Sequence, residues 1–491
     1  MSDSASAFDS PSPLDATPSA TCSLPVHLQN RNLLLFAGCT GLQYFAAPVL
    51  YVGVTQASLC DRLGADARMS NLPATMYFAM TAMPALIAWA RPSVASLKPN
   101  LIICYSVTAM MLAVMAWAMV APVSNQVRLA LVILQGAVAG SAMPAAIAFL
   151  WEAIGRGTEE SRRGLALSLA FGAGPLLAVA GSFGSQILLS GELAGRKIEW
   201  LQYPWNFAVL FAAGVPCLLL GAFLGSRFVI PLPARDAVRE PFAKVADLCG
   251  GMLLGLSALG FYLQDMRLAG HALLAVAGIL FVHHFRDILS QRQLLLATIV
   301  TVLLYSGNTI PSNMNLYTSE VLGDLPENYA GYQNTLRFGF KVVTGFLLGW
   351  ILTKTNPRAG ILLTGGIFVA AQLWAIFATG TAYLFAFGIY GAGELVGVYA
   401  PNYMLSASAE SQIRRNMAFV TMLMVPAAPT GYLYGAITDF VTSRGITAFG
   451  VTNSRALGFQ ASFAACAALM TMGLVLAVCL LPKRPRRNST D

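Results

Sequence analysis

Charged residues are scarce in this sequence. Only 11% of its 491 residues are Asp, Glu, Lys or Arg, whereas 56% are hydrophobic and the mean hydropathy is +0.64. About a quarter of the residues of a soluble protein are charged, so this composition excludes a soluble protein. A membrane-spanning helix needs about 20 mostly apolar residues, and apolar segments of that length tile nearly the whole chain. The composition predicts an all-α polytopic membrane protein.

Motifs for redox chemistry, metal binding and ATP hydrolysis are also missing. The eight cysteines are scattered, and no CxxC pair or P-loop occurs. The four histidines lie outside the middle of every predicted span, so a primary pump or an intramembrane enzyme is not favoured. We therefore expect no cofactor, no metal and no enzymatic activity. The net charge of +8 does not indicate nucleic-acid binding, because basic cytoplasmic loops explain it in a membrane protein.

The N-terminal residues 1–30 have no apolar run and are rich in Ser, Pro and Ala. They read as a disordered cytoplasmic tail and not as a cleaved signal peptide. The apolar segments that follow predict fourteen spans, which puts both termini on one side of the membrane. The spans lie near 33–57, 70–90, 100–121, 127–151, 164–189, 205–226, 244–263, 269–285, 293–318, 328–353, 358–379, 381–407, 416–440 and 456–481.

Basic residues indicate which side this is. With the tail inside, twenty of the thirty lysines and arginines fall on inner segments and eight fall on outer ones. Cytoplasmic loops carry the excess of Lys and Arg. We therefore expect a multi-pass protein of the cell (inner) membrane with both termini in the cytoplasm. The two basic residues left over, Arg337 and Lys341, lie inside a span.

The two halves of the chain repeat each other. Leu33-Leu-Leu-x4-Thr40-x-Leu42-x-Tyr44 recurs as Leu294-Leu-Leu-x4-Thr301-x-Leu303-x-Tyr305, and Gly136-x3-Gly140-x3-Pro144 recurs as Gly393-x3-Gly397-x3-Pro401. An ordered set of matches at nearly constant offset indicates a duplication. The predicted units are the tail 1–30, a six-helix bundle 31–227, a linker with two inserted helices 228–292, a six-helix bundle 293–482 and a basic cytoplasmic tail 483–491.

Three short motifs accompany this arrangement: Tyr317-x3-Val321-Leu322-Gly323-x6-Ala330-Gly331, Gly349-Trp-Ile-Leu-Thr353-Lys354 and Gln135-Gly136. They resemble the linker after the first helix of the second half, the Gly-x-x-x-Asp-Arg loop and the fourth-helix Gln-Gly of the major facilitator superfamily. Six plus two plus six spans are similar to its fourteen-helix drug:proton antiporter branch. Thr353 replaces the Asp of the loop, and Val132 replaces the fourth-helix Arg. The resemblance implies two bundles that rock around a central substrate site.

Three charged residues lie near the middle of spans, namely Arg337, Lys341 and Glu394. A charge at this depth is costly in hydrocarbon, so it faces a cavity or a partner. The four-residue spacing of Arg337 and Lys341 puts both on one helix face. Two cations against one acid leave a surplus positive charge, which favours an anionic or zwitterionic substrate.

Two roles are open for this trio. Glu394 neutralises a cation and pins helices together, or one cation binds the substrate's anionic group and Glu394 carries a coupling proton. We expect Arg337 to bind the substrate, because its planar fork suits a carboxylate or phosphate. Lys341 is then expected to pair with Glu394.

Polar and aromatic residues on the central spans complete the candidate site. A few such groups in an apolar pocket orient an organic ligand, although buried amides also bridge helices. The candidates beside the trio are Gln43, Tyr44, Asn308, Asn313, Asn334, Tyr390 and Asn402.

These features favour a secondary active transporter or facilitator of a small organic solute that works by alternating access. One alternative is a multidrug efflux proton antiporter, and another is a transporter-like receptor or scaffold that binds its ligand without moving it. The expected partners are the small-molecule substrate, the lipid bilayer and a coupling ion such as the proton.

Overall fold

The computed structural model describes residues 24–485 with gaps at 52, 160–165, 167–172, 194, 233–238, 354, 409–415 and 417–418. Most of the predicted N-terminal tail, the end of the predicted basic tail and Lys354 lie outside the described residues. The side chain of Thr353 does as well.

The described part of the first half is helical apart from one small hairpin. Its strands β1 (Glu192–Leu193) and β2 (Arg196–Lys197) pair antiparallel, with Glu192 opposite Lys197. The helices are α1 (Val26–Phe45), α2 (Ala47–Leu50), α3 (Thr55–Arg62), α4 (Ala67–Ala79), η1 (Met80–Ala82), α5 (Met83–Ala90), η2 (Val94–Ser96), α6 (Leu97–Val120), α7 (Asn125–Gly157), α9 (Gly174–Ser190) and α10 (Trp205–Ser226).

Helices form the described parts of the linker and the second half, apart from loops and an isolated β-bridge between Ala448 and Val451. In the linker these are η4 (Phe242–Lys244), α11 (Ala246–Leu263), α12 (Arg267–His284) and α13 (Arg286–Leu289). The second half has α14 (Arg292–Tyr305), η5 (Ser306–Thr309), α15 (Pro311–Leu322), α16 (Glu327–Thr353), α17 (Pro357–Phe377), η6 (Gly380–Leu384), α18 (Phe385–Gly393), α19 (Val396–Ser406), α21 (Met424–Ala427), α22 (Pro429–Ser443) and α23 (Ser454–Leu480).

Eleven helical segments of the described chain are long and apolar enough to cross a membrane. They coincide with eleven of the predicted spans. At the other three predicted spans the structure has the helices α1, α9 and α16, which are not among the eleven segments. The predicted all-α membrane architecture is therefore confirmed. The count of fourteen spans and the unit boundaries stay predictions.

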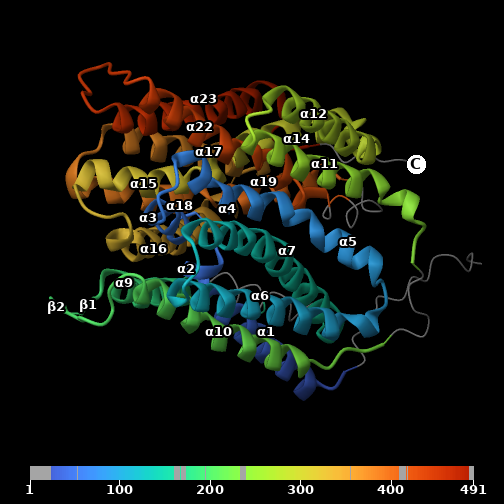
Figure 1. Cartoon of the computed structure of the whole chain (residues 1–491). Helices are drawn as coiled ribbons and strands as arrows, with labels where there is room; N and C mark the ends of the chain where they lie inside the picture. The colour runs from blue at the N-terminus through green and yellow to red at the C-terminus, as the bar shows by residue number, and fades with distance from the viewer. Residues whose placement is uncertain are drawn as a thin grey trace, which may run out of the picture.

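The helices form two bundles, which Figure 1 shows one below the other. In the first half, α6 packs against α7 and α10, α4 packs against α7, and α1 contacts α9 and α10. In the second half, α16 and α17 contact α18, and α23 contacts α14, α17 and α22. The most extensive contacts between the bundles are those of α9 with α16 and of α4 with α22, and α3 and α4 also contact α15. The inserted helices α11 and α12 pack on each other as a hairpin.

Three of the central spans are broken instead of continuous. In the first span of the first half, α1 ends at Phe45, directly after Tyr44. In the corresponding span of the second half, α14 ends at Tyr305. The third break separates α18, which ends at Gly393, from α19, which begins at Val396. The first two breaks thus fall where the repeat aligns Tyr44 with Tyr305. Broken helices of this kind bring side chains and backbone groups into the protein interior at mid-membrane.

Polar contacts fasten the two bundles at one end, where α3 leads into α4 and α15 leads into α16. Among the described residues, Ser58 Oγ donates to Asn315 Oδ1 at 2.7 Å, and Asn71 Nδ2 donates to Asn313 Oδ1 at 2.6 Å. Both bonds are buried and cross from the first bundle to the second. The distribution of basic residues predicts that this end faces outside.

Asp439 of α22 adds a charged contact at the same end. Its carboxylate accepts the backbone N–H groups of Ala67 and Arg68, both at 3.0 Å, and pairs with the Arg68 guanidinium at 3.0 Å. Ala67 and Arg68 begin α4, where unpaired N–H groups favour a negative charge. An acid of the second bundle therefore caps a helix of the first.

We expect Asp439→Asn to loosen this end. Losing the charge removes a hydrogen-bond acceptor worth about 1.5–3 kcal/mol, so a cysteine introduced at Ala57, a buried position of α3, should react at least about tenfold faster with a membrane-impermeant thiol reagent added outside. The variant Asp265→Asn, which breaks an exposed pair with Arg267, serves as the control. An unchanged rate, or reaction only from the cytoplasmic side, would contradict the closed outer end.

Candidate functional site

The structure brings the three mid-span charges together at the break between α18 and α19. Arg337 and Lys341 lie one turn apart on α16, and both donate to Glu394. Arg337 Nε reaches Oε2 at 3.0 Å, its Nη2 donates to Oε1, and Lys341 Nζ reaches Oε2 at 3.1 Å. One carboxylate thus accepts hydrogen bonds from two cations, and the cluster has one more positive than negative charge.

Burial differs within the trio. The side chains of Arg337 and Glu394 are 9% and 10% exposed, whereas that of Lys341 is 25% exposed. The expected pair of Lys341 with Glu394 is present, but Arg337, which was expected to be left for the substrate, pairs with Glu394 as well. Arg337 makes the two-pronged bond to Glu394, and Lys341 makes a single bond from the more open position.

One donor of Arg337 remains unused among the described residues. Its Nη1 is buried and has no hydrogen-bond partner there. A buried donor without a partner is costly, and the cost is larger for a charged group. The cluster can therefore offer this N–H and the Lys341 ammonium to an arriving anion.

Close packing of α16 on α18 makes the trio possible. A Cβ atom at Gly391 would overlap the backbone carbonyl of Arg337, so only glycine lets the two helices approach this closely. Gly391 lies one residue after Tyr390 and three before Glu394. The glycine thus sets the distance across which Arg337 and Glu394 meet.

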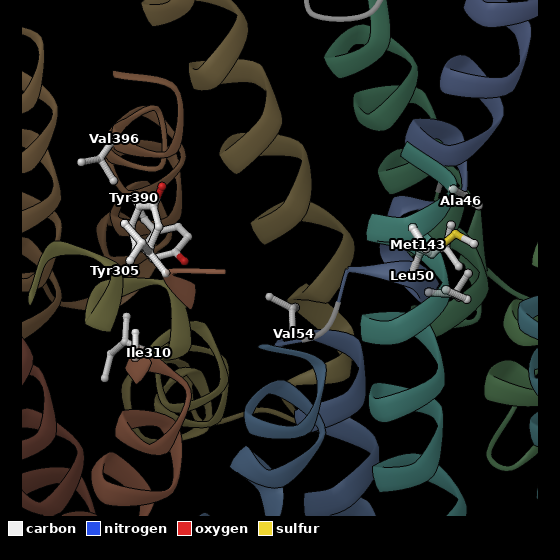
Figure 2. Close-up of a cluster of buried hydrophobic side chains, with 14 of the residues drawn as sticks. Ala46, Leu50, Val54, Met143, Tyr305, Ile310, Tyr390 and Val396 are labelled. Atoms are coloured by element: carbon white, nitrogen blue, oxygen red, sulfur yellow. The ribbon is translucent and has the colours of Figure 1, made fainter. Parts of the chain in front are cut away.

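Aromatic rings flank the two cations. The Arg337 guanidinium carbon lies 5.3 Å from the centre of the Tyr390 ring and 5.6 Å from that of Phe338. Lys341 Nζ is 5.9 Å from the Phe338 ring, within range of a cation–π interaction. The Tyr390 hydroxyl donates to the backbone oxygen of Asn308 at 3.4 Å. Figure 2 shows Tyr390 and Tyr305 on the side of the second bundle.

Tyrosines of the first bundle face this cluster. The Tyr51 ring is 6.3 Å from that of Phe338 and 6.4 Å from that of Tyr44. Tyr44 and Tyr51 pack in one apolar cluster with Phe338, the neighbour of Arg337 on α16. The site is therefore built from both bundles.

Two residues beside this cluster were missed by the sequence analysis, namely Tyr51 and Phe338. A signal for Phe338 was present, because the repeat offset that aligns Tyr44 with Tyr305 also aligns Tyr77 with Phe338. Aromatic residues thus occupy the same place in the two halves. Tyr51 follows the first helix break, which the apolar pattern did not predict.

The structure places the other predicted residues at varying positions. Asn334 is buried on α16, one turn before Arg337, and Asn308 lies on η5 beside Tyr390. Gln43 instead donates to the Tyr105 hydroxyl at 2.7 Å inside the first bundle.

Two further predicted residues have structural contacts away from the trio. Asn313 donates to Thr438 and Ser462 and accepts from Asn71, so it belongs to the closed outer end. Asn402 is exposed on α19, eight residues past Glu394. The geometry does not bring Gln43, Asn313 or Asn402 into contact with the charged trio.

Comparisons with known proteins place the fold. No protein-family model matches the sequence, and no curated protein matches it by sequence. Among solved structures, an auto-inhibited POT family peptide transporter is similar over 93% of this chain and 99% of its own, with 13% identity and a TM-score of 0.63. A variant of the nucleoside transporter NupG matches over 93% and 100%, with 11% identity and a TM-score of 0.60.

A D-xylose–proton symporter is also similar, over 93% of this chain and 97% of its own, with 12% identity and a TM-score of 0.57. Together with the two transporters above, it shows that this chain has a major-facilitator-like fold. The resemblance inferred from the sequence is thus confirmed at the level of the fold. The assignment to the drug:proton antiporter branch stays a prediction.

The pairing geometry predicts unequal effects of substitutions on stability. Glu394→Gln leaves the buried Arg337 and the partly exposed Lys341 without a carboxylate and should lower the free energy of unfolding by about 3–5 kcal/mol. Adding Arg337→Met should restore most of that loss, whereas Lys341→Met alone should have a much smaller effect. Glu240→Gln, which breaks the exposed pair with Lys244, is the control.

Thermal unfolding of the purified variants, followed by size-exclusion chromatography, measures these differences. Wild-type stability in Glu394→Gln would show that the trio does not hold α16 and α18 together. Rescue by Lys341→Met in place of Arg337→Met would restore the assignment expected from the sequence.

Proposed function

We propose that this chain is a secondary transporter of a small organic anion or zwitterion, which binds between the two bundles. The observation that carries the proposal is the mostly buried trio with more cations than acids, in which Arg337 Nη1 has no hydrogen-bond partner among the described residues. Buried ionisable groups in a membrane protein mark substrate and ion pathways. In this fold, substrates bind near the midplane between the bundles, which then rock to expose them on alternate sides.

Lys341 is the cation that binds the anionic group of the substrate in place of Glu394. It holds Glu394 by one bond and is the most exposed member of the trio, so it leaves at the lowest cost. When an anionic group binds Lys341, Arg337 remains paired with Glu394 and no charge in the site is unpaired. Arg337 Nη1 then supplies a second donor to the same anion.

Glu394 is the candidate coupling group. The empty trio has a net charge of about +1, and an anion reduces it to zero by simple counting of full charges. One proton on Glu394 would return the loaded site to the charge of the empty site. Cotransport of one proton with one anion therefore keeps the buried charge constant through the cycle.

The solved neighbours support a small polar solute as cargo. They include transporters of nucleosides, peptides and D-xylose, the last of them a proton symporter. Another is a POT family transporter in complex with 5-aminolevulinic acid, with 13% identity and a TM-score of 0.62. As its name states, that ligand has both an amino group and a carboxylic acid.

A thermal-shift screen of carboxylates, phosphates and amino acids on the purified protein identifies a ligand. We expect Lys341→Gln to weaken its binding by about ten- to a hundredfold, because it removes a charged hydrogen bond of about 1.5–3 kcal/mol. The variant Lys244→Gln, an exposed lysine of the linker, should bind as the wild type does. Wild-type affinity in Lys341→Gln would reject this role for Lys341.

Exchange of labelled ligand in proteoliposomes separates the proposed function from its alternatives. A transporter exchanges label across the membrane, whereas a receptor or scaffold binds without exchange. Preference for bulky lipophilic cations over anions would instead favour the multidrug antiporter. If Glu394 carries the coupling proton, Glu394→Gln together with Arg337→Met should exchange label but fail to accumulate it along a proton gradient.

A further inference from the structure

A cavity of about 440 Å³ lies between the inserted hairpin α11–α12 and the place where α4 meets α21 and α22. Its wall is mostly apolar, with side chains such as Met76, Met80, Leu256 and Phe281. No member of the charged trio lines it. Residues of α4 and α22, two helices in contact across the bundles, belong to its wall, so the cavity borders that interface.

Two glycines leave open space on the hairpin side of this cavity. A Cβ atom added to Gly255 of α11 or to Gly278 of α12 would meet nothing within 4 Å. These glycines are therefore not needed for close helix packing. Protein covers the inserted helices poorly, since only 11% of the apolar window of each is buried. At the depth of membrane-spanning helices, the surrounding medium is hydrocarbon.

The cavity lining extends along most of α11. It runs from Asp247 to Tyr262, a distance of about 22 Å at the helical rise per residue. Half of a bilayer's hydrocarbon core is about 15 Å deep. A lipid chain that enters from one leaflet can therefore lie along this surface for its whole length.

Polar groups mark the ends of the lining. Asp247 Oδ2 and His283 Nδ1 are 2.7 Å apart at the end predicted to be cytoplasmic, and α13 begins there with Arg286. At the other end, the Tyr262 hydroxyl contacts His271 Nδ1 at 2.5 Å. An acid beside basic groups at the cytoplasmic end complements the ammonium and phosphate of a zwitterionic lipid head group.

We propose that this cavity binds the acyl chain of a zwitterionic membrane phospholipid, whose head group lies at the Asp247–His283 end. An empty apolar cavity forfeits the contacts that its lining would make, and water finds too few polar partners there. A lipid chain is as apolar as the wall, so its binding comes from packing contacts. The bound chain touches the hairpin and both bundles, and it fills the gap beside their interface.

The test uses the full-length protein in nanodiscs with phosphatidylethanolamine that carries a photoreactive diazirine on its acyl chain. Irradiation and peptide mapping should place the label on the α4 peptide that contains Met76 and Met80. Gly255→Leu and Gly278→Leu fill the cavity from two different helices. Each should reduce the labelling of that peptide at least about fivefold, because the added side chain occupies the space of the lipid chain.

The control variant Gly260→Leu adds the same side chain to α11, also in open space but outside the cavity lining. It should leave the labelling of α4 unchanged. Undiminished labelling of α4 in both filled variants would overturn the proposal, as would label confined to lipid-facing residues such as Leu253 and Ile279. A fatty acid that carries the same diazirine and labels α4 while the phospholipid does not would also overturn it.

Discussion

Two cations and one carboxylate share a site inside the membrane, and the central architecture of this protein depends on balancing their charges. Taking a charge out of water costs several kcal/mol unless partners replace the solvent. Here Glu394 accepts from both Arg337 and Lys341, which fixes α16 against α18. Gly391 permits the close approach, and Glu394 follows directly on α18, its backbone N–H still bonded to the Tyr390 oxygen at 2.9 Å.

The two cations differ in burial and in their bonds to Glu394, and this difference assigns them different roles. Arg337 is buried and bound by two prongs, so it acts as the fixed counter-ion of Glu394. Lys341 is more exposed and bound once. In the account proposed here, a substrate anion competes for Lys341 alone. When the anion replaces Glu394 as the partner of Lys341, each cation of the loaded site has an anionic partner, whereas a lone charge inside a membrane would be penalised.

Contacts between the bundles relate this site to movement. The two halves are fastened by Ser58, Asn71 and Asp439 and their partners at the end predicted to be outside. The tyrosines Tyr44 and Tyr51 of the first bundle pack against Phe338, beside the trio of the second. A rocking motion that opens the outer end would therefore also change how these tyrosines meet the bound solute.

Much of this arrangement could be predicted from the sequence, because charge is rare in the spans and its position is informative. Composition predicted the membrane fold, and Arg337, Lys341 and Glu394 were identified as a trio before their contacts were known. The helix breaks could not be predicted, since apolar runs look alike whether the helix continues or stops. Residues such as Gln43 and Asn313 were polar in the right spans, but hydrogen bonds within or between helices occupy them. Which cation holds Glu394 more tightly depends on side-chain geometry that spacing alone does not contain.

The most direct measurement is an electron cryo-microscopy structure of the protein with a bound anionic ligand. We predict that an anionic oxygen of the ligand lies within about 3 Å of Lys341 Nζ, the length of a charge-assisted hydrogen bond. Arg337 should keep both of its bonds to Glu394 in that complex. A ligand whose anionic group lies elsewhere, with Lys341 still bound to Glu394, would contradict the account.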